Sequence, residues 1–237
     1  MKLRGQPART FPSPPAGRET PETSRTALAA ELAAVVAACH SRGWCHGTAG
    51  NFSAVLRRRP LILLITPSGA DKGGLRAGDL LAVGGDGLPV SGFEDARPGA
   101  ARRPSAETAL HCAIVQTLGA GAVLHTHSVA ATLLGEHFLE RGAVRIRGYE
   151  MLKGLRGIAT HAAEAHVPVL ANSQDMEELA GRVRALAAST PDFHGLLLAG
   201  HGLYTWGEDL AEARRHLEIL EFLFEVVARK TRFAAFE

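Results

Sequence analysis

Two histidines separated by a single residue are the sharpest chemical signal in the chain. His125 and His127 follow three apolar residues, Ala-Val-Leu, at positions 122–124. In a β-strand, side chains at positions i and i+2 point to the same face, about 6–7 Å apart. Two imidazoles placed in this way can both reach one metal ion at about 2.0–2.1 Å. The simpler alternative is one core histidine beside one surface histidine, and the pair alone does not decide between the two.

A third histidine, His201, lies between two glycines directly after the apolar residues 196–198. Glycine carries no side-chain bulk, so another group can approach the chain closely here. Three neutral imidazoles that leave one coordination position open are typical of a catalytic zinc centre. We therefore predict one divalent metal ion, most simply Zn²⁺, on His125, His127 and His201, although imidazole also suits iron, cobalt or nickel. The alternative for His201 is a loop histidine that caps a strand end.

The remaining histidines are weaker ligand candidates. His161 and His166 have no flanking glycines. Five others have no partner at ligand spacing and are expected to have ordinary structural roles: His40, His46, His137, His194 and His216.

Three short segments have the composition of anion-binding turns. Residues 47–51 (Gly-Thr-Ala-Gly-Asn) precede a predicted strand, residues 66–69 (Thr-Pro-Ser-Gly) follow one, and Ser105 is expected to cap a helix. Backbone N–H groups in such turns and at helix N-termini bind phosphate. Neither glycine cluster matches a P-loop or a GxGxxG fingerprint, so the sequence does not indicate a nucleotide. Each segment taken alone is more often an ordinary turn or cap.

Two glutamates are candidates for acid–base chemistry. Glu107 and His111 are four residues apart, which places them on one face of a predicted helix. Glu150 lies in the segment Gly-Tyr-Glu-Met-Leu-Lys at positions 148–153, after a strand. The residues themselves do not rank Glu107 against Glu150 as the base.

Strands and helices must alternate irregularly to position these groups. Apolar spacing predicts helices that begin at Ser24 and end at Gly43, that open at Ser105, and that cover 129–134, 176–186 and 210–227, the last opened by the capping pair Asp209 and Glu212. Short apolar runs predict strands within 51–90, with a turn at 84–87, and at 122–127, 167–170, 196–198 and 203–205. Several strands follow one another directly, which favours a mixed or antiparallel sheet covered by helices.

Length and composition are consistent with this interpretation. The chain has 237 residues, 46% of them apolar and 21% charged, and a formal net charge of +2. So small a charge does not indicate nucleic acid or an anionic membrane as a partner. Residues 1–22 contain five prolines and are predicted to be a disordered tail, which leaves a single domain over 23–237. Three cysteines without a close pair, and no long apolar run, predict a cytoplasmic protein.

The motifs GTAGNFS, TPSG, PSAETALH, HTHS and GHGLYTWG occur together and in this order. Their combination resembles the class II aldolase/adducin family, zinc enzymes and relatives that act on sugar phosphates, over roughly residues 25–230. The resemblance implies a three-layer α/β/α sandwich with a central, mainly antiparallel sheet, assembled as a homotetramer, with one Zn²⁺ per subunit on the three histidines above. It also implies a small phosphorylated ketose as substrate.

The same resemblance assigns roles to further residues. In one branch of the family the position matching Glu150 is the proton carrier, and in the fuculose-phosphate aldolase branch the position matching Glu107 is the catalytic carboxylate. The phosphate-binding positions match Asn51, Ser68, Gly69 and Ser105. A second serine that the pattern has after Ser105 is Ala106 here, so one hydroxyl is missing.

Within the family, residues 148–154 and 168–175 are most similar to a branch of dehydratases that acts on a methylthio-substituted ketose phosphate in methionine salvage. The implied reaction uses the metal to polarise the C2 carbonyl. Glu150 removes the C3 proton, the C4 hydroxyl leaves as water, and the enol tautomerises to a 2,3-diketone. An aldolase or epimerase with the same metal site remains an alternative, as does a non-catalytic scaffold of the adducin type.

Overall fold

The computed structural model describes residues 22–91, 93, 102–190 and 192–233. Within these ranges, eight strands form one sheet in the order β3-β2-β1-β4-β8-β7-β6-β5. Every neighbouring pair among them is antiparallel except β6 and β7, so the predicted, mainly antiparallel sheet is confirmed. The strands are β1 (Asn51–Arg58), β2 (Leu61–Ile65), β3 (Leu81–Gly84), β4 (Ala122–Thr126), β5 (Ala143–Arg147), β6 (Glu164–Leu170), β7 (Gly195–Leu198) and β8 (Gly202–Gly207).

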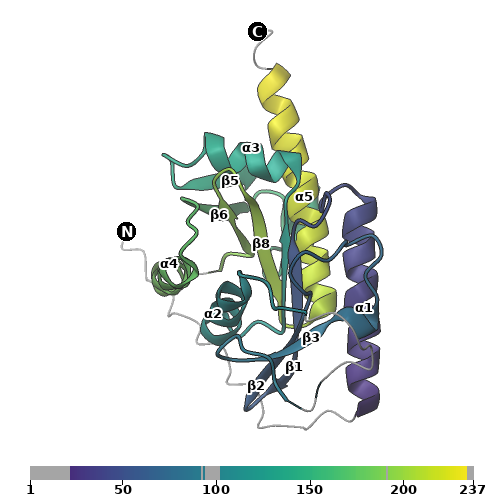
Figure 1. Cartoon of the computed structure of the whole chain (residues 1–237). Coiled ribbons are helices and arrows are strands. Elements are labelled where there is room, and N and C mark those ends of the chain that lie inside the picture. The colour runs from purple at the N-terminus through teal and green to yellow at the C-terminus, as the bar shows by residue number, and fades with distance from the viewer. Residues whose placement is uncertain (1–21, 92, 94–101, 191, 234–237) are drawn as a thin grey trace.

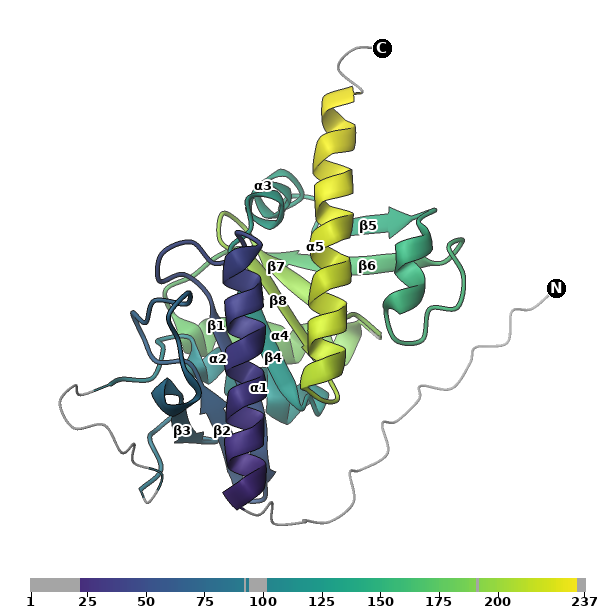
Figure 2. The ribbon, with the colours of Figure 1, turned by 90° about the vertical axis from the view of Figure 1, so that its right-hand side faces the viewer.

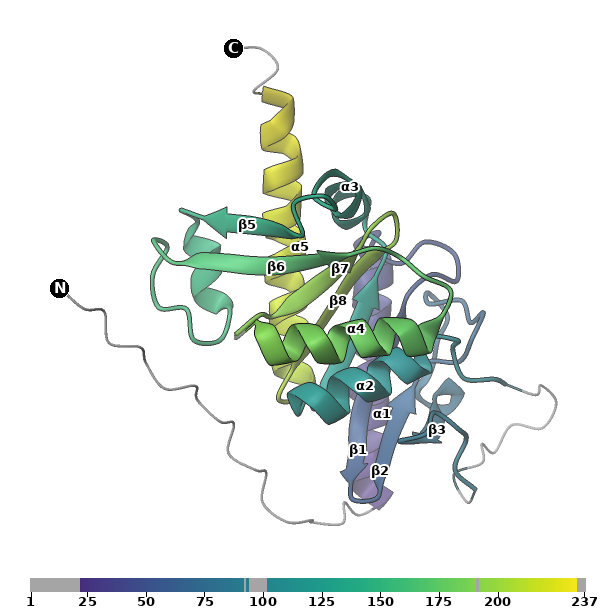
Figure 3. The ribbon, with the colours of Figure 1, turned by 90° about the vertical axis from the view of Figure 1, so that its left-hand side faces the viewer.

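Helices cover both faces of the sheet, which confirms the predicted three layers (Figure 1). One face packs against α1 (Glu22–Ser41) and α5 (Leu210–Phe233), as Figure 2 shows. The other packs against α2 (Thr108–Leu118) and α4 (Met176–Ser189), which lie in front of the strands in Figure 3. The shorter α3 (Val129–His137) follows β4 and packs against α5. Two short 3₁₀ helices, η1 (Ala77–Asp79) and η2 (Glu150–Gly154), lie in the connections.

The register of three adjacent strands places three polar or aromatic residues in one row. Asn51 of β1 pairs with His125 of β4, and His125 pairs with Tyr204 of β8. Tyr204 belongs to the hydrophobic core on the side of α2 and α4. The neighbouring Thr126 faces the opposite layer, where its hydroxyl donates to Glu221 of α5 at 2.6 Å. The sheet therefore presents the row that contains His125 to the side of α2.

Most helix starts follow from local hydrogen bonding. Asp209 accepts from the backbone N–H of Glu212 at 2.8 Å, which confirms the predicted start of the last helix. Ser128 caps α3 by accepting from Ala131 at 3.1 Å. Asp175 caps α4 by accepting from the first two backbone N–H groups that follow Met176.

Two predicted helix starts are wrong. Ser24 lies inside α1, which already includes Glu22. Ser105 does not cap α2, because its hydroxyl accepts from the backbone N–H of Glu107 at 3.3 Å and its carbonyl accepts from Thr108 at 3.0 Å. These bonds close a separate turn ahead of the helix. The predicted tail lies outside the described residues apart from Glu22.

Within the described ranges, no helix combines the length and the apolar character that crossing a bilayer requires.

Candidate metal centre

The three predicted ligand histidines lie together at one end of the central strands. His125 is the fourth residue of β4, His127 follows the strand, and His201 lies in the turn between β7 and β8. Nε2 of His125 lies 2.8 Å from Nε2 of His127 and 3.2 Å from Nε2 of His201. Ligand atoms of all three lie within 4.8 Å of one another, and this is the one such cluster found in the described part of the chain. We call these three rings the imidazole cage.

Two glycines allow the neighbouring strands to close on the strand that carries the cage. A Cβ atom on Gly202 would lie 2.0 Å from the carbonyl oxygen of Thr126, and one on Gly50 would lie 2.7 Å from that of His125. Both contacts are with backbone, which cannot move aside independently of the sheet. The sequence-based inference that glycine beside His201 permits close approach is therefore supported by geometry.

Hydrogen bonds on the far side of two rings set their tautomers. Nδ1 of His125 lies 2.9 Å from the carbonyl oxygen of Leu203, which only accepts, so Nδ1 carries the proton. Nδ1 of His201 lies 3.2 Å from Oδ1 of Asn172, with the same consequence. In this tautomer the lone pair on Nε2 points into the cage. Asn172 received no role from the sequence, although it lies in the 168–175 segment that carried the family resemblance.

The cage fits a metal cation. Burial lowers the pKa of His125 well below its usual value and that of His127 to about 4, so both rings are neutral ligands at pH 7. Lone pairs on His125 and His201 face each other with no proton between them. A carboxylate oxygen of Glu107 lies 3.1 Å from Nε2 of His201 as well. A divalent cation is the partner that satisfies this set of electron donors, with the orienting bonds from outside that metal-bound histidines typically have.

Glu107 lies directly beside the cage. Its two oxygens lie 3.1 Å from Nε2 of His201 and 3.6 Å from Nε2 of His125. The side-chain amide of Asn51 donates to the second of these oxygens. Burial alone would raise the pKa of Glu107, but the neighbouring His201, His125 and Asn51 side chains outweigh burial and hold this pKa well below the usual range. The carboxylate is therefore ionised at the mouth of the cage.

Tyr204 forms the wall behind His125. The two rings stack with centroids 3.9 Å apart and an interplanar angle of 13°. Burial raises the pKa of Tyr204 well above its usual value, so the phenol stays neutral. Sequence reasoning assigned Tyr204 only to a strand, but the register of β4 and β8 would have revealed the pairing.

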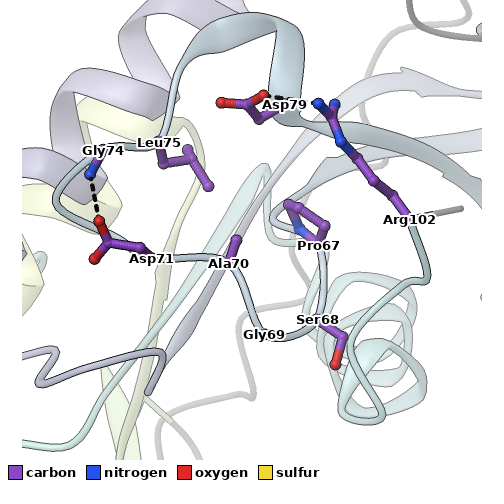
Figure 4. A pocket seen from close by; sticks show the side chains of 9 residues that line it. All are labelled: Pro67, Ser68, Gly69, Ala70, Asp71, Gly74, Leu75, Asp79 and Arg102. Carbon is purple, nitrogen blue, oxygen red and sulfur yellow. Dashed lines mark hydrogen bonds and ion pairs between the residues drawn. The ribbon is translucent and has the colours of Figure 1, made fainter. Parts of the chain in front are cut away.

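Two of the four predicted phosphate-binding residues, Asn51 and Ser105, contact each other beside Glu107. Asn51 donates to the hydroxyl of Ser105 at 3.3 Å. Ser68 and Gly69 follow β2 and line a hollow of about 340 Å³, shown in Figure 4 with Asp79 and Arg102. The backbone N–H of Ser68 already donates to the carbonyl of Arg103 at 2.9 Å, so its hydroxyl is the group left to meet a ligand.

A buried lysine, Lys72, links the predicted turn at 47–51 to the residue that follows the predicted turn at 66–69. The Lys72 side chain is 1% exposed, and its ammonium donates to the carbonyl oxygens of Thr48 and Ala70, both at 2.9 Å. Burial lowers its pKa. Nothing in the sequence distinguished this lysine from a surface residue.

Glu150 lies away from the cage. It begins η2, and its side chain is 67% exposed. Its carboxylate forms an ion pair with Lys153 and lies 3.1 Å from Nδ1 of His161. η2 packs on the α5 face, where Arg215 donates to the carbonyl of Gly154 at 3.0 Å (Figure 2). Among the described residues, no hydrogen bond or ion pair joins Glu150 to the cage. One chain therefore brings Glu107, but not Glu150, together with the predicted ligands.

Comparison with known proteins agrees with this architecture. The sequence profile described as "Class II Aldolase and Adducin N-terminal domain" matches residues 30–228. Among solved structures, YgbL from Klebsiella pneumoniae, a putative aldolase/epimerase/decarboxylase, has a TM-score of 0.70 at 29% identity, over 86% of this chain and 90% of that one. L-fuculose-1-phosphate aldolase from Thermus thermophilus has a TM-score of 0.66 at 27% identity, over 89% and 98%.

The chain thus belongs to the class II aldolase and adducin family. Within it, methylthioribulose-1-phosphate dehydratase from Sorangium cellulosum is 44% identical over 209 residues, covering 88% of this chain and 94% of the relative. The enzyme of that name from Serratia proteamaculans is 46% identical over 199 residues, covering 82% and 92%.

Proposed function

We propose that this protein catalyses the loss of water from 5-methylthioribulose 1-phosphate, giving 2,3-diketo-5-methylthiopentyl 1-phosphate, in methionine salvage. The observation that carries the proposal is the imidazole cage with an ionised carboxylate at its mouth, in a chain similar over most of its length to dehydratases of that name. All three cysteines are free and buried, which supports the proposed cytoplasmic location.

Zn²⁺ is the metal we propose for the cage, held by His125, His127 and His201. Once bound, it would act as a Lewis acid toward the C2 carbonyl oxygen of the ketose and so acidify the proton on C3. The rings contribute fixed orientation, because His125 is anchored to Leu203 and His201 to Asn172. A rigid cage keeps the reorganisation that accompanies charge development small.

The protein's own groups then move protons and hold the substrate. A carboxylate takes the proton from C3, and the electrons of that C–H bond form the C3–C4 double bond. The C4–O bond breaks, and the hydroxyl leaves with a proton as water. The enol at C3 ketonises to the diketone, so substrate and product differ by one water molecule. Positioned proton transfer of this kind typically contributes ~10²–10⁴-fold in rate.

The phosphate group is proposed to bind at the corner formed by Asn51, Ser68, Gly69 and Ser105. The hydroxyls and the amide there are neutral donors, and the corner adjoins Glu107. Lys72 links the turn at 47–51 to the residue that follows the turn at 66–69. A substrate whose phosphate lies here has its C2–C4 segment directed toward the cage.

Two carboxylates are candidates for the proton carrier, and their positions make different demands. Glu107 already lies at the cage. Glu150 is exposed on the opposite layer, so it can act only in the site of another subunit. The homotetramer that the family resemblance implies is our proposal for how this occurs. Exposed apolar side chains support such an interface: Met151 beside Glu150 is 41% exposed, and Val129 and Leu133, just after the cage, are 65% and 52% exposed.

Substitution of each carboxylate separates these roles. We expect Glu150→Gln to keep zinc and fold but to lose turnover by at least ~10²-fold. Glu107→Gln should also lower turnover and, in addition, weaken the contacts at the cage. If Glu150→Gln turns over normally while Glu107→Gln is inactive, the carrier is Glu107.

A mixing experiment tests the contribution across subunits. His127→Ala and Glu150→Gln subunits, each inactive alone, are unfolded together and refolded. A site shared between subunits predicts that the mixed oligomers regain activity, since some sites then receive an intact cage and an intact Glu150. Failure to regain activity, with mixed oligomers verified by mass spectrometry, would place every catalytic group in one chain.

The primary test of the proposed function uses purified protein and methylthioribulose 1-phosphate. Formation of the diketone is followed by ultraviolet absorbance, with and without a chelator. The alternative is an aldolase or epimerase, favoured by the similarity to L-fuculose-1-phosphate aldolase. Release of dihydroxyacetone phosphate or an aldehyde, without loss of water, would establish that alternative. Protein that binds no metal at stoichiometry would instead point to a non-catalytic scaffold.

A further inference from the structure

Four side chains form a continuous chain of hydrogen bonds that ends at Glu107. It begins at Ser53 of β1, whose hydroxyl lies 2.7 Å from Nδ1 of His111 on α2. Nε2 of His111 bonds to Oδ1 of Asn51, and Nδ2 of Asn51 bonds to Glu107. Ser53 and His111 are 0% exposed and Asn51 is 5% exposed. None of these contacts depends on an ion in the cage.

The chain has one consistent assignment of hydrogens. An ionised carboxylate only accepts, so Asn51 must turn its NH₂ group toward Glu107. The oxygen of the Asn51 amide then faces His111, which must donate from Nε2. A neutral His111 that donates from Nε2 has a free lone pair on Nδ1, and this accepts the proton of the Ser53 hydroxyl. Burial lowers the pKa of His111 to about 4, in agreement with a neutral ring.

Asn51 is the member of the chain whose hydrogen bonds can be reversed, by rotation of its side-chain amide. The two ends of an amide have nearly the same shape, so a rotation by half a turn fits the same space. It would put oxygen against the carboxylate of Glu107 and NH₂ against the N–H of His111. In a buried site both mismatches are costly, because no water replaces the lost bonds. Among the described residues, His111 is the group that donates to the oxygen of Asn51, so without it only the acceptors at the NH₂ end, Glu107 and Ser105, favour this orientation.

We propose that His111 is a positioning residue, which acts through the Asn51 amide to hold the Glu107 carboxylate at the imidazole cage and the Ser105 hydroxyl at the phosphate corner. The inference deepens the proposed function and rests on it only for the identity of the substrate. The same Asn51 nitrogen donates both to Glu107 and, at 3.3 Å, to Ser105. One orientation therefore serves two proposed parts of the site.

Tyr204 keeps His111 in register with the cage. Its ring meets His111 edge-on at 5.8 Å and stacks on His125 at 3.9 Å. The positions of Asn51, His125 and Tyr204 are fixed by the pairing of β1, β4 and β8. His111 thus acts within a frame that is already rigid, which leaves the orientation of the amide as its own contribution.

Two substitutions at position 111 separate the bond from the bulk of the ring. His111→Phe fills similar space without a donor or an acceptor. His111→Gln keeps an N–H that can donate to Asn51. We expect His111→Phe to lower kcat at least ~10-fold, with metal stoichiometry unchanged, and His111→Gln to recover most of that loss. Equal losses in both variants, or no loss in His111→Phe, would overturn the proposal.

A double-mutant cycle tests whether His111 acts through Asn51. In an Asn51→Ala background, His111→Phe should change kcat less than ~2-fold, because the link is already absent. A full loss in that background would show that His111 acts by another route. The cycle is repeated on Co²⁺-loaded protein without substrate, where the visible spectrum senses the position of Glu107 and Glu107→Gln provides the reference spectrum.

Nuclear magnetic resonance of the metal-free protein gives a readout that needs neither substrate nor variants. With ¹⁵N-labelled histidine, His111 should show the neutral tautomer protonated at Nε2. The tautomer protonated at Nδ1 would overturn the proposal, even if His111→Phe does not fold. If the wild-type protein shows no dehydratase activity but has this tautomer and the expected cobalt spectra, the proposed function fails and the positioning role stands.

Discussion

Two groups of histidines lie at opposite ends of β8, and their rings pack almost identically. At the start of the strand, the rings of His125 and His201 are 4.8 Å apart at 90°. Near its end, those of His194 and His216 are 4.9 Å apart at 79°. One ring in each group is anchored to a β8 carbonyl, His125 to Leu203 at 2.9 Å and His216 to Trp206 at 2.7 Å.

The groups differ in what the Nε2 atoms face. Nε2 of His216 accepts from the backbone N–H of Arg156 at 3.2 Å, and Nε2 of His194 donates to the carbonyl of Arg156 at 2.7 Å. Both rings therefore clasp one residue of the segment after η2. In the imidazole cage the Nε2 atoms face one another instead. Proximity of histidines does not by itself indicate a metal site. Ring nitrogens that converge on one point, with no hydrogen-bond donor from the protein between them, do indicate one.

The largest expected effect is loss of metal from the cage. His127→Ala should lower the metal content from one ion per subunit to near zero and abolish turnover, since two imidazoles rarely retain zinc against solvent. Mass-spectrometric metal analysis after dialysis measures this. The His194→Ala variant should keep the metal ion in the imidazole cage. A comparable loss of metal in this variant would remove the distinction between the two groups.

The next largest effect is expected from a substitution at a glycine where two backbone segments approach closely. In Gly202→Ala the new Cβ would meet the Thr126 carbonyl at 2.0 Å, so the turn that carries His201 must move away from β4. We expect a loss of about 2–4 kcal/mol in the free energy of unfolding, together with weaker metal binding. Gly181→Ala is the matched control, because a Cβ there meets nothing within 4 Å. Denaturant unfolding that shows equal effects in both would contradict the close approach.

The group of His194 and His216 should make the stability of the fold depend on pH under acidic conditions. Burial lowers the pKa of His216 to about 4, whereas the unfolded residue titrates near 6.5. Between these values the unfolded chain takes up a proton that the folded one does not, so stability falls as the pH falls from 6.5 to 4. This group alone contributes about 3 kcal/mol. With a chelator present, the His216→Gln variant should lose less stability than wild type over this pH range. If the free energies of unfolding of the two proteins fall in parallel with pH, the buried, neutral state of His216 is contradicted.

The smallest effect concerns the outer partner of His201. Asn172→Ala removes the acceptor for Nδ1 and should weaken metal binding by roughly 10-fold without changing its stoichiometry. Competition with a coloured chelator gives the affinity. An unchanged affinity would mean that the turn alone orients the ring.

Local patterns predicted a mixed or antiparallel sheet covered by helices, most elements and the ligand trio, because strand periodicity and glycine placement act over a few residues. The three-layer arrangement was implied by the family resemblance. The partners that arrive from distant strands were not predictable in this way. Asn172, Tyr204 and Lys72 have roles that depend on strand order and register, which no short window contains. The position of Glu150 on the opposite layer depends on how β5 and β6 extend the sheet, for the same reason.

The location of β4 between β1 and β8 has a consequence for how the cage can open. Its amides are bonded on both sides, so hydrogen exchange at Leu124 and His125 requires opening of the centre of the sheet. His201 lies in the turn that joins β7 to β8, so it is not held between two neighbouring strands as β4 is. Metal exchange should therefore begin with excursions of that turn, while the ring of His125 on the central strand stays in place.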